Sequence, residues 1–234
     1  MRKMLSFRPE RFVVPVLILV GWEMFSRSGA LPPALLPAPS TVVVAWADWV
    51  FGIMLGVAIG WSRFVEVTIE PTLQMLRPIP PVSWIPLAII WFGIADKPAI
   101  FLVFLGAFFP VLLNTIHGVK TVDRNLIRAG AMAGADQRRL LRHIVLPAAM
   151  PSIFAGLRIA IGSAWMLTVT AEMVAVKSGV GYVLWDSYYF LRYDIVIAAM
   201  ASIGLLGYLS DLAIRLVMAR VLHWQRGTTL QGEG

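Results

Sequence analysis

The chain has no cysteine among its 234 residues. This excludes disulfide frameworks, zinc sites built on thiolates and catalysis by a thiol. Charged side chains are also scarce, at 14% of the residues, while 59% are hydrophobic and the mean hydropathy is +0.77. A chain of this composition has too little polar side chain to cover a globule of its size in water. We therefore expect a protein that lies within a lipid bilayer.

Motifs for phosphate binding and for catalysis are missing too. There is no G-x-x-x-x-G-K-[ST] sequence and no Gly-Lys pair, so a loop that holds ATP phosphates has to come from another chain. The three histidines, His117, His143 and His223, are isolated from one another. Neither a metal site nor a hydrolase site is expected, and we predict no cofactor in this chain.

The net charge of +7 raises nucleic acid as a possible partner. No dense run of Lys and Arg with interleaved aromatic residues is present, however, and most basic residues lie beside apolar runs. Membrane topology explains that placement more simply than a nucleic-acid surface does. We expect membrane lipid as a partner and no nucleic acid.

Apolar runs predict an all-α, polytopic transmembrane bundle of about six spans, since crossing the hydrocarbon core takes ~20 helical residues. The expected spans are Phe12–Phe25, Thr41–Trp61, about Pro78–Ile94, about Pro98–Ile116, Ile153–Val176 and Ile195 to about Met218. The first run also fits a secretory signal peptide, but Glu23 near its end favours a span. Gly52, Gly56 and Gly60 would share one helix face, which suits close helix packing.

The distribution of basic residues predicts the orientation of the bundle. An even number of crossings puts both termini on one side, and fifteen of the twenty Lys and Arg residues then fall in the segments on that side. The outer loops hold four, namely Arg27, Lys97, Lys177 and Arg192, and Arg158 lies inside the fifth span. The positive-inside rule therefore places both termini in the cytoplasm.

A basic, patterned loop from Leu126 to Ile153 separates two long apolar segments. We expect a helix over Asp123–Ala133, a break at Gly134, and a second short helix from an N-cap at Asp136 to about Val145, stopped by Pro147. The second helix has one apolar and one arginine-rich side. Such a pair of helices docks into a soluble partner or lies on the lipid surface as an interfacial anchor.

The order Arg128-Ala129-Gly130, Gly134, Ile144, Leu146-Pro147 resembles the EAA loop of the membrane subunits of bacterial ABC importers. In that family the loop is the coupling helix that sits in a groove of the ATP-hydrolysing subunit. The resemblance implies that Leu140 and Ile144 contact that subunit. Arg128 stands where the family pattern opens with Glu, and Gly130 where it has a second Ala. The implied coupling residues are Arg128, Ala129, Gly130, Ala133, Gly134, Ala135, Asp136, Leu140, Ile144, Leu146 and Pro147.

The segments "LLPAPSTVV", "QMLRPIPPVSWIPLAIIWFGI", "FFPVLLNTIHGVKTVDRNLI", "LPAAMPSIFAGLRIAIGSAWMLTVTAEM" and "SGVGYVLWDS" resemble permeases of the sulfonate, taurine, nitrate and bicarbonate importers. Aliphatic sulfonate permeases look most similar. The family is longer near Val50, so the Thr41–Trp61 run is open to being a join of two family segments.

That resemblance implies a single permease domain over residues 1–234, with a cytoplasmic coupling loop at 120–150, in the bacterial inner membrane. It also implies three kinds of protein partner: a second copy, two ATP-binding cassette ATPases that hold ATP and Mg, and a periplasmic or lipid-anchored substrate-binding protein. The competing class is a carrier or channel driven by an ion gradient. Such proteins usually show intramembrane carboxylates or broken helices in two related halves, whereas here only Glu172 and Asp211 lie in or near the last spans and no internal repeat is visible.

Polar residues within the spans are candidates for the pathway or its gate, because they are costly in lipid. They are Asn114, Arg158, Ser163, Thr168 and Glu172. Arg158 would either extend to the headgroups or attract an anion. Glu172 would repel an anion, which favours a hydrogen bond that holds the bundle together. The other three line a wet path or bond locally, and the small residues of the fifth span favour close packing.

Overall fold

The computed structural model describes residues 39–94, 96–176 and 178–222, and every regular element in these ranges is helical. The elements are α2 (Pro39–Trp61), α3 (Arg63–Leu76), the 3-10 turn η1 (Pro81–Trp84), α4 (Ile85–Phe92), α5 (Asp96–Lys120), α6 (Arg124–Met132), α7 (Gln137–Leu140), the π-helical turn η2 (Leu141–Val145), α8 (Leu146–Val174), α9 (Val180–Tyr189) and α10 (Tyr193–Val221). The all-α class is confirmed. The chain divides into two units after Ala47, and the packing described below is that of the second unit.

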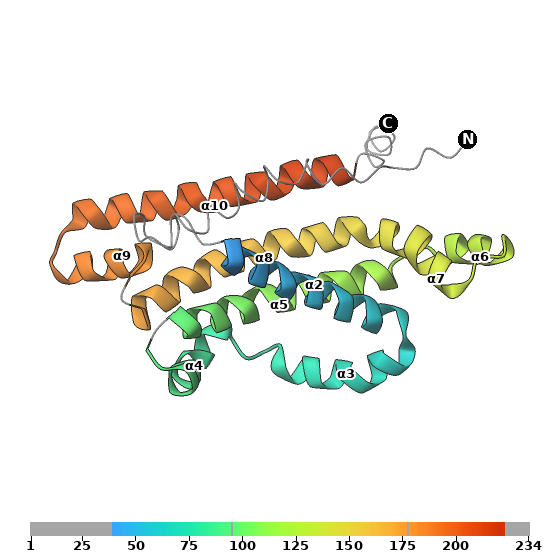
Figure 1. Ribbon diagram of the computed structural model, residues 1–234, viewed down its shortest axis with the longest axis horizontal. Helices are drawn as coiled ribbons and strands as arrows, with labels where there is room; N and C mark the ends of the chain where they lie inside the picture. Colours follow the sequence, from blue (N-terminus) through green and yellow to red (C-terminus); the bar gives the residue numbers. More distant parts are fainter. Residues whose placement is uncertain (1–38, 95, 177, 223–234) are drawn as a thin grey trace, which may run out of the picture. The chain divides into compact units, whose positions relative to one another are not determined.

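Helices α5 and α8 lie side by side and form the centre of this unit (Figure 1). Glycine lets their backbones approach closely: a Cβ built on Gly156 of α8 would lie 2.8 Å from the Asn114 Cβ and 2.9 Å from the Pro110 carbonyl oxygen of α5. Buried Ala160 packs there against Ala107 and Val111. The small residues of the fifth span therefore form a packing surface, as the sequence favoured.

Helix α2 packs on α5 through the predicted glycine face. A Cβ on Gly56 would lie 2.7 Å from the Thr115 Cβ, and one on Gly60 would lie 2.7 Å from the Val119 Cβ. Gly52 faces α5 one turn earlier, with Val111 at 3.4 Å from its built Cβ. The close approach of these two helices thus depends on having no side chain at those positions.

The third expected span differs from the prediction. Instead of one helix over Pro78–Ile94, the chain forms α3, a break, and then η1 with α4, the two parts meeting at 81°. Pro78, Pro80 and Pro81 explain the break, since proline donates no hydrogen bond and disfavours helical geometry in the residue before it. Helix α4 alone is too short to span, and it is long enough only when taken together with α3.

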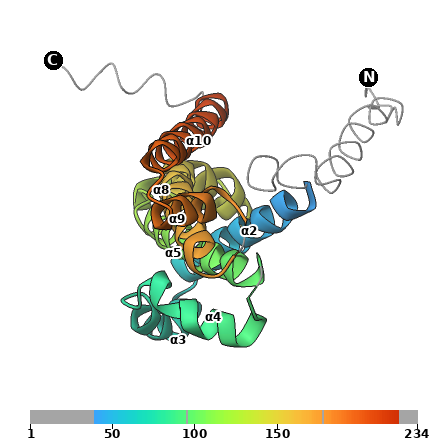
Figure 2. The ribbon, with the colours of Figure 1, turned by 90° about the vertical axis from the view of Figure 1, so that its left-hand side faces the viewer.

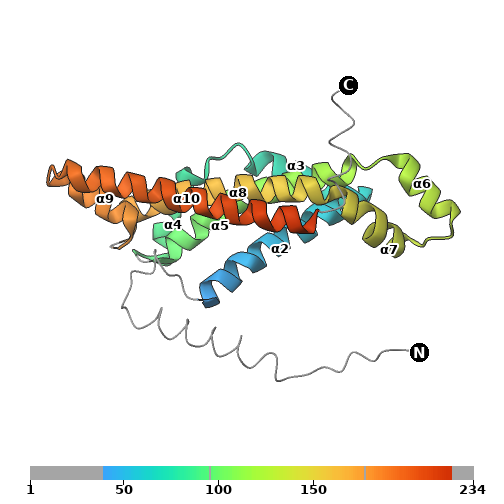
Figure 3. The same ribbon diagram turned by 90° about the horizontal axis from the view of Figure 1, so that it is seen from above.

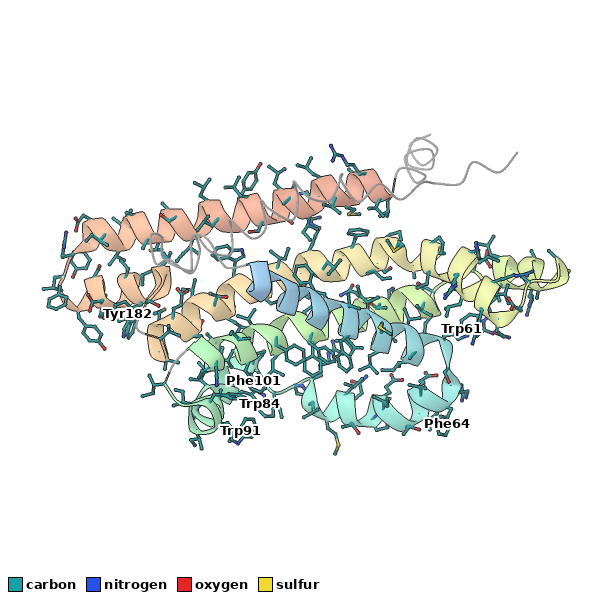
Figure 4. The ribbon with its side chains drawn as sticks, in the orientation of Figure 1. Trp61, Phe64, Trp84, Trp91, Phe101 and Tyr182 are labelled. Carbon is teal, nitrogen blue, oxygen red and sulfur yellow. The ribbon has the colours of Figure 1, made fainter. Side chains whose placement is uncertain are left out.

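At the far end of this broken span, α4 packs against the start of α5. Trp84, Trp91 and Phe92 surround Phe101, with ring centroids between 5.6 and 6.3 Å from it (Figure 4). Because Trp84 and Trp91, at the two ends of η1 with α4, meet the same residue of α5, this segment crosses the start of α5, and the expected antiparallel pairing of two full spans stays a prediction. Figure 2 shows α9 and α10 on the other side of α8 from α3 and α4.

Three described helical stretches are long and apolar enough to cross a membrane: Lys97–Lys120, Gln137–Val174 and Tyr193–Val221. The broken pair of α3 with η1 and α4 makes a fourth if it is one span, and Trp49–Trp61 of α2 is a shorter apolar helix. The first expected span, Phe12–Phe25, lies outside the described residues. The expectation of about six spans is thus met only approximately.

The α5–α8 contact predicts a difference between two glycines of α8. Gly156→Ala forces a methyl group into Asn114 and a backbone carbonyl, which should cost about 1–3 kcal/mol and lower the unfolding temperature by several degrees. Gly162→Ala is the matched control, because a Cβ there meets nothing within 4 Å. Thermal unfolding of the purified protein in detergent measures both. Equal unfolding temperatures for the two variants would contradict the packing described here.

Candidate functional site: a basic helical hairpin and the polar links of the bundle

The loop after α5 forms a compact hairpin of α6 and α7. The Asp123 side chain caps α6 by accepting a hydrogen bond from the Asn125 N–H at 2.8 Å, and Asp136 caps α7 by accepting one from the Arg139 N–H at 2.9 Å. Between the helices, Gly134 has φ +81°, a conformation that glycine adopts without strain. The first short helix, the N-cap at Asp136 and the break at Gly134 are confirmed.

Gly130 allows α6 to lie directly on the segment after α7. A Cβ at Gly130 would collide with the Ile144 Cδ1 and would lie 2.8 Å from the Leu140 Cδ2. Leu140 is only 4% exposed. The expectation that Leu140 contacts another subunit is therefore wrong for its side chain, because it packs inside the hairpin with Ile144 nearby. In the sequence, the feature that could have indicated this close contact was Gly130, which stands at the family's second alanine position.

The exposed surface of the hairpin belongs to other residues. Arg128, Ala129, Ala133 and Asp136 are exposed, whereas Ala135 and Leu146 are half-buried. Met132, which the sequence analysis did not single out, is 84% exposed at the end of α6. The hairpin lies at the end of α8 opposite α9 (Figure 3). It therefore presents arginine and two large apolar side chains, Leu126 and Met132, at one end of the bundle.

The prediction that Pro147 ends the second helix is wrong. The π-helical turn η2 carries the chain from α7 into α8, the Leu146 N–H donating to the Leu141 carbonyl oxygen, and Pro147 sits in the first turn of α8. Proline is tolerated there, because N–H groups in a first turn have no partner within their own helix. The result is an uninterrupted helical run over Gln137–Val174.

Comparison with known proteins agrees with this architecture. Residues 49–223 match the model of the binding-protein-dependent transport system inner membrane component. The chain belongs to this family of ABC importer permeases. A chain of the MetNI methionine ABC transporter, solved in inward-facing conformations, shares the type I importer permease fold: the TM-score is 0.61 at 18% identity, over 88% of this chain and 98% of that one.

Relatives in the sulfonate, taurine and nitrate group are similar over most of this permease. The putative aliphatic sulfonates transport permease SsuC of Escherichia coli is 35% identical, over 90% of each chain, and the taurine permease TauC of that species is 32% identical, over 92% of this chain and 78% of its own. The nitrate import permease NrtB of Synechocystis is 36% identical, over 69% of this chain and 59% of its own. These relatives are permease subunits, so the chain is a transport subunit and not an enzyme.

Arg158 of the permease forms an ion pair between two helices. Its Nε donates to the Asp211 Oδ1 of α10 at 2.8 Å, and Asp211 also pairs with Arg215 one turn further along α10. The neighbouring Trp165 Nε1 donates to the Ser210 Oγ at 3.1 Å. Arg158 therefore helps to hold α10 against α8, a role that neither the headgroup nor the anion reading of the sequence included.

Two of the other polar candidates, Asn114 and Thr168, form hydrogen bonds within their own helices. The Asn114 side-chain amide donates to the Pro110 carbonyl oxygen, and the Thr168 hydroxyl donates to the Ala164 carbonyl oxygen, each at 2.8 Å. Ser163 is half-buried on α8. No group of three or more His, Cys, Asp and Glu side chains placed to hold a metal ion occurs in the part of the chain that the structure describes.

Glu172 holds the start of α9 against α8. It is 8% exposed, and its Oε2 accepts a hydrogen bond from the Gly181 N–H at 2.7 Å. A Cβ at Gly179, which has φ +106°, would collide with the Glu172 carboxylate, and one at Gly181 would lie 2.9 Å from the Glu172 Cβ. The two glycines of "SGVGY" therefore form a cradle for this carboxylate. The hydrogen bond is of the kind that the sequence favoured over ligand contact.

Removing this carboxylate should loosen the α8–α9 connection. Glu172→Ala leaves the buried Gly181 N–H without its acceptor, at a cost of about 1–3 kcal/mol. We expect a lower unfolding temperature and faster proteolysis between α9 and α10. Glu172→Gln keeps a carbonyl oxygen at the same place and should be affected much less. Limited proteolysis and thermal unfolding of both variants measure this effect. An equal loss of stability in the two variants would show that the hydrogen bond accepted by the side-chain oxygen is not its cause.

Proposed function

We propose that two copies of this permease, two ATPase subunits and an external substrate-binding protein together import a small oxyanion, with an aliphatic sulfonate as the first candidate. Two-fold pairing is usual when one chain supplies half of a pathway. The names of the sulfonate, taurine and nitrate relatives support the anion class. Taurine, nitrate and bicarbonate remain alternatives, and the substrate-binding protein would select among them.

The observation that carries the proposal is the hairpin joined to α8 without a break. In the proposed mechanism, the ATPase subunits bind ATP and Mg, and their closure pushes on the exposed face of the hairpin. Arg128 and Met132 lie on that face. Since Val145 is fully buried with Val119 and Ala149 at the base of the hairpin, the push would move the ends of α5 and α8 together. That movement would switch the pathway between its two sides.

The polar contacts of the spans favour an ATP-driven importer over one driven by an ion gradient. Such a protein needs an intramembrane carboxylate that is free to bind and release an ion. Glu172 is engaged by the backbone of Gly181, Asp211 by two arginines, and Glu66 and Glu70 of α3 by Lys120. These four carboxylates therefore have structural partners, which agrees with energy supplied by ATP from outside the chain.

Gly134→Val tests the coupling role of the hairpin. A Cβ at this position meets nothing within 4 Å, so only the backbone is strained, by ~1 kcal/mol or more for a β-branched residue at positive φ. The change should tilt α7 against α6 while the spans stay intact. We expect normal membrane insertion, with ATPase co-purification or transport-linked hydrolysis reduced several-fold. Arg128→Glu, which restores the residue usual in the family, is the control and should be tolerated. Normal transport by Gly134→Val would leave the hairpin as an interfacial anchor only.

Membrane orientation can be measured on single-cysteine variants, and the cysteine-free chain gives no background labelling. The charge distribution predicts that cysteines at Ala34 and Ser178 react with an impermeant reagent from outside, and those at Gln137 and Gly227 only from inside. The hairpin has to be cytoplasmic to meet an ATPase. Outside labelling at Gln137 would therefore reject both the orientation and the coupling role.

A further inference from the structure

The break in the third span exposes backbone and a charge at an unusual depth. Residues 77–80, between α3 and η1, are all exposed in one copy of the chain. Pro78, Pro80 and Pro81 cannot donate backbone hydrogen bonds, and the Leu76 carbonyl oxygen instead accepts one from the Ile79 N–H at 3.1 Å. Such a segment is tolerated within a membrane only where protein covers it or where it lines a water-filled cavity.

The depth of this break follows from the contacts of α3. At its beginning, Glu66 pairs with Lys120 at the last residue of α5, with Nζ and Oε1 2.8 Å apart. Val65, Ile69 and Leu73 then pack along the Phe108, Leu112 and Ile116 side of α5, and Figure 1 shows α3 running beside that helix. Eleven residues separate Glu66 from Arg77, and at 1.5 Å each they advance ~16 Å. That is about half of the hydrocarbon thickness of ~30 Å.

Aromatic residues support this placement. Trp61 and Phe64 lie at the α2–α3 corner, and Trp84 and Trp91 lie around Phe101 at the opposite end of the broken span (Figure 4). Aromatic belts of this kind mark the two interfaces of a membrane protein. Arg77 lies between the two groups along the chain.

Arg77 also differs from Lys120 and Arg158 in forming no ion pair. Lys120 is paired with Glu66 and Glu70, and Arg158 with Asp211. Among the described residues, Arg77 forms no ion pair and no side-chain hydrogen bond. At ~16 Å from the level of the Glu66–Lys120 pair, its side chain is too short to reach the headgroups. An unpaired charge at that depth marks a water-filled path or a ligand contact.

We propose that Arg77, at the break of the third span, lines the translocation path and binds the transported oxyanion as it passes the middle of the membrane. The inference rests on the proposed import of an anion by paired permeases. A guanidinium offers parallel N–H donors that match the oxygens of a sulfonate, nitrate or carbonate group, and it stays charged at every physiological pH. The two copies would each contribute one arginine beside the exposed break.

The test uses the complete assembly of permease, ATPase and binding protein in proteoliposomes, with labelled ethanesulfonate, taurine and nitrate supplied in parallel. Arg77→Gln should lower uptake of the transported anion about tenfold, as expected when one charge-assisted contact is lost. ATP hydrolysis stimulated by the loaded binding protein should stay within about twofold of the wild type, because hairpin and ATPase are untouched. The anion transported per ATP therefore falls. Arg77→Lys, which keeps the charge, should retain most of the uptake.

Arg63→Gln is the matched control, since it removes an arginine from the beginning of the same helix α3 and should leave uptake unchanged. Uptake by Arg77→Gln within about twofold of the wild type would overturn the inference. A parallel fall of uptake, hydrolysis and ATPase co-purification in both Arg77 variants would also overturn it, by showing a structural role only. Failure of the wild-type assembly to import any of the three anions would instead count against the proposed function itself.

Discussion

The bilayer offers no hydrogen-bonding solvent, and this constraint accounts for most of the polar contacts in the structure. Every N–H, carbonyl and charge within the hydrocarbon region needs a partner from the protein or from a water-filled cavity. Asn114 and Thr168 meet the need within their own helices. Arg158 meets it across helices with Asp211, and Glu172 meets it with the backbone of α9. The polar residues of the spans are therefore first of all links of the bundle.

The same constraint separates two uses of proline in this chain. Pro110 lies within α5, where the helix continues around it, and the side chain of Asn114 bonds to its carbonyl oxygen. Pro147 follows a π-helical turn and occupies a position that needs no donor. Pro78, Pro80 and Pro81, by contrast, follow one another so closely that the helix cannot continue. Among the described helices it is that cluster that produces the sharp break, and Arg77, which forms no ion pair, lies directly at it.

Much of the fold could be predicted from local patterns. Hydropathy gave the long helices, because length and apolar content are properties of a single segment. The N-caps at Asp123 and Asp136 and the positive φ of Gly134 follow from residue types next to one another. The face formed by Gly52, Gly56 and Gly60 follows from helical spacing alone. In each case the physical cause lies within a few residues of the effect.

The errors arose where the cause lies elsewhere in the chain. The polar helix α3 is held by Lys120 and by α5, so its own weakly apolar sequence did not reveal it. The partner of Arg158 is 53 residues away, and no local pattern pointed to Asp211. Leu140 has the periodicity of a docking face, yet the missing side chain of Gly130 draws it inward. These features depend on contacts between distant segments of the chain, which local sequence patterns do not indicate.

Helix α8 is the element through which the two ends of the bundle are connected. At one end it continues without interruption from the hairpin, and at the other Glu172 ties it to α9. Along its length it touches α5 through Gly156 and Ala160 with almost no side chain between the backbones. Close-packed interiors shift as units rather than deforming continuously. In the proposed mechanism, a displacement of the hairpin would therefore be carried along α8 toward its contact with α9.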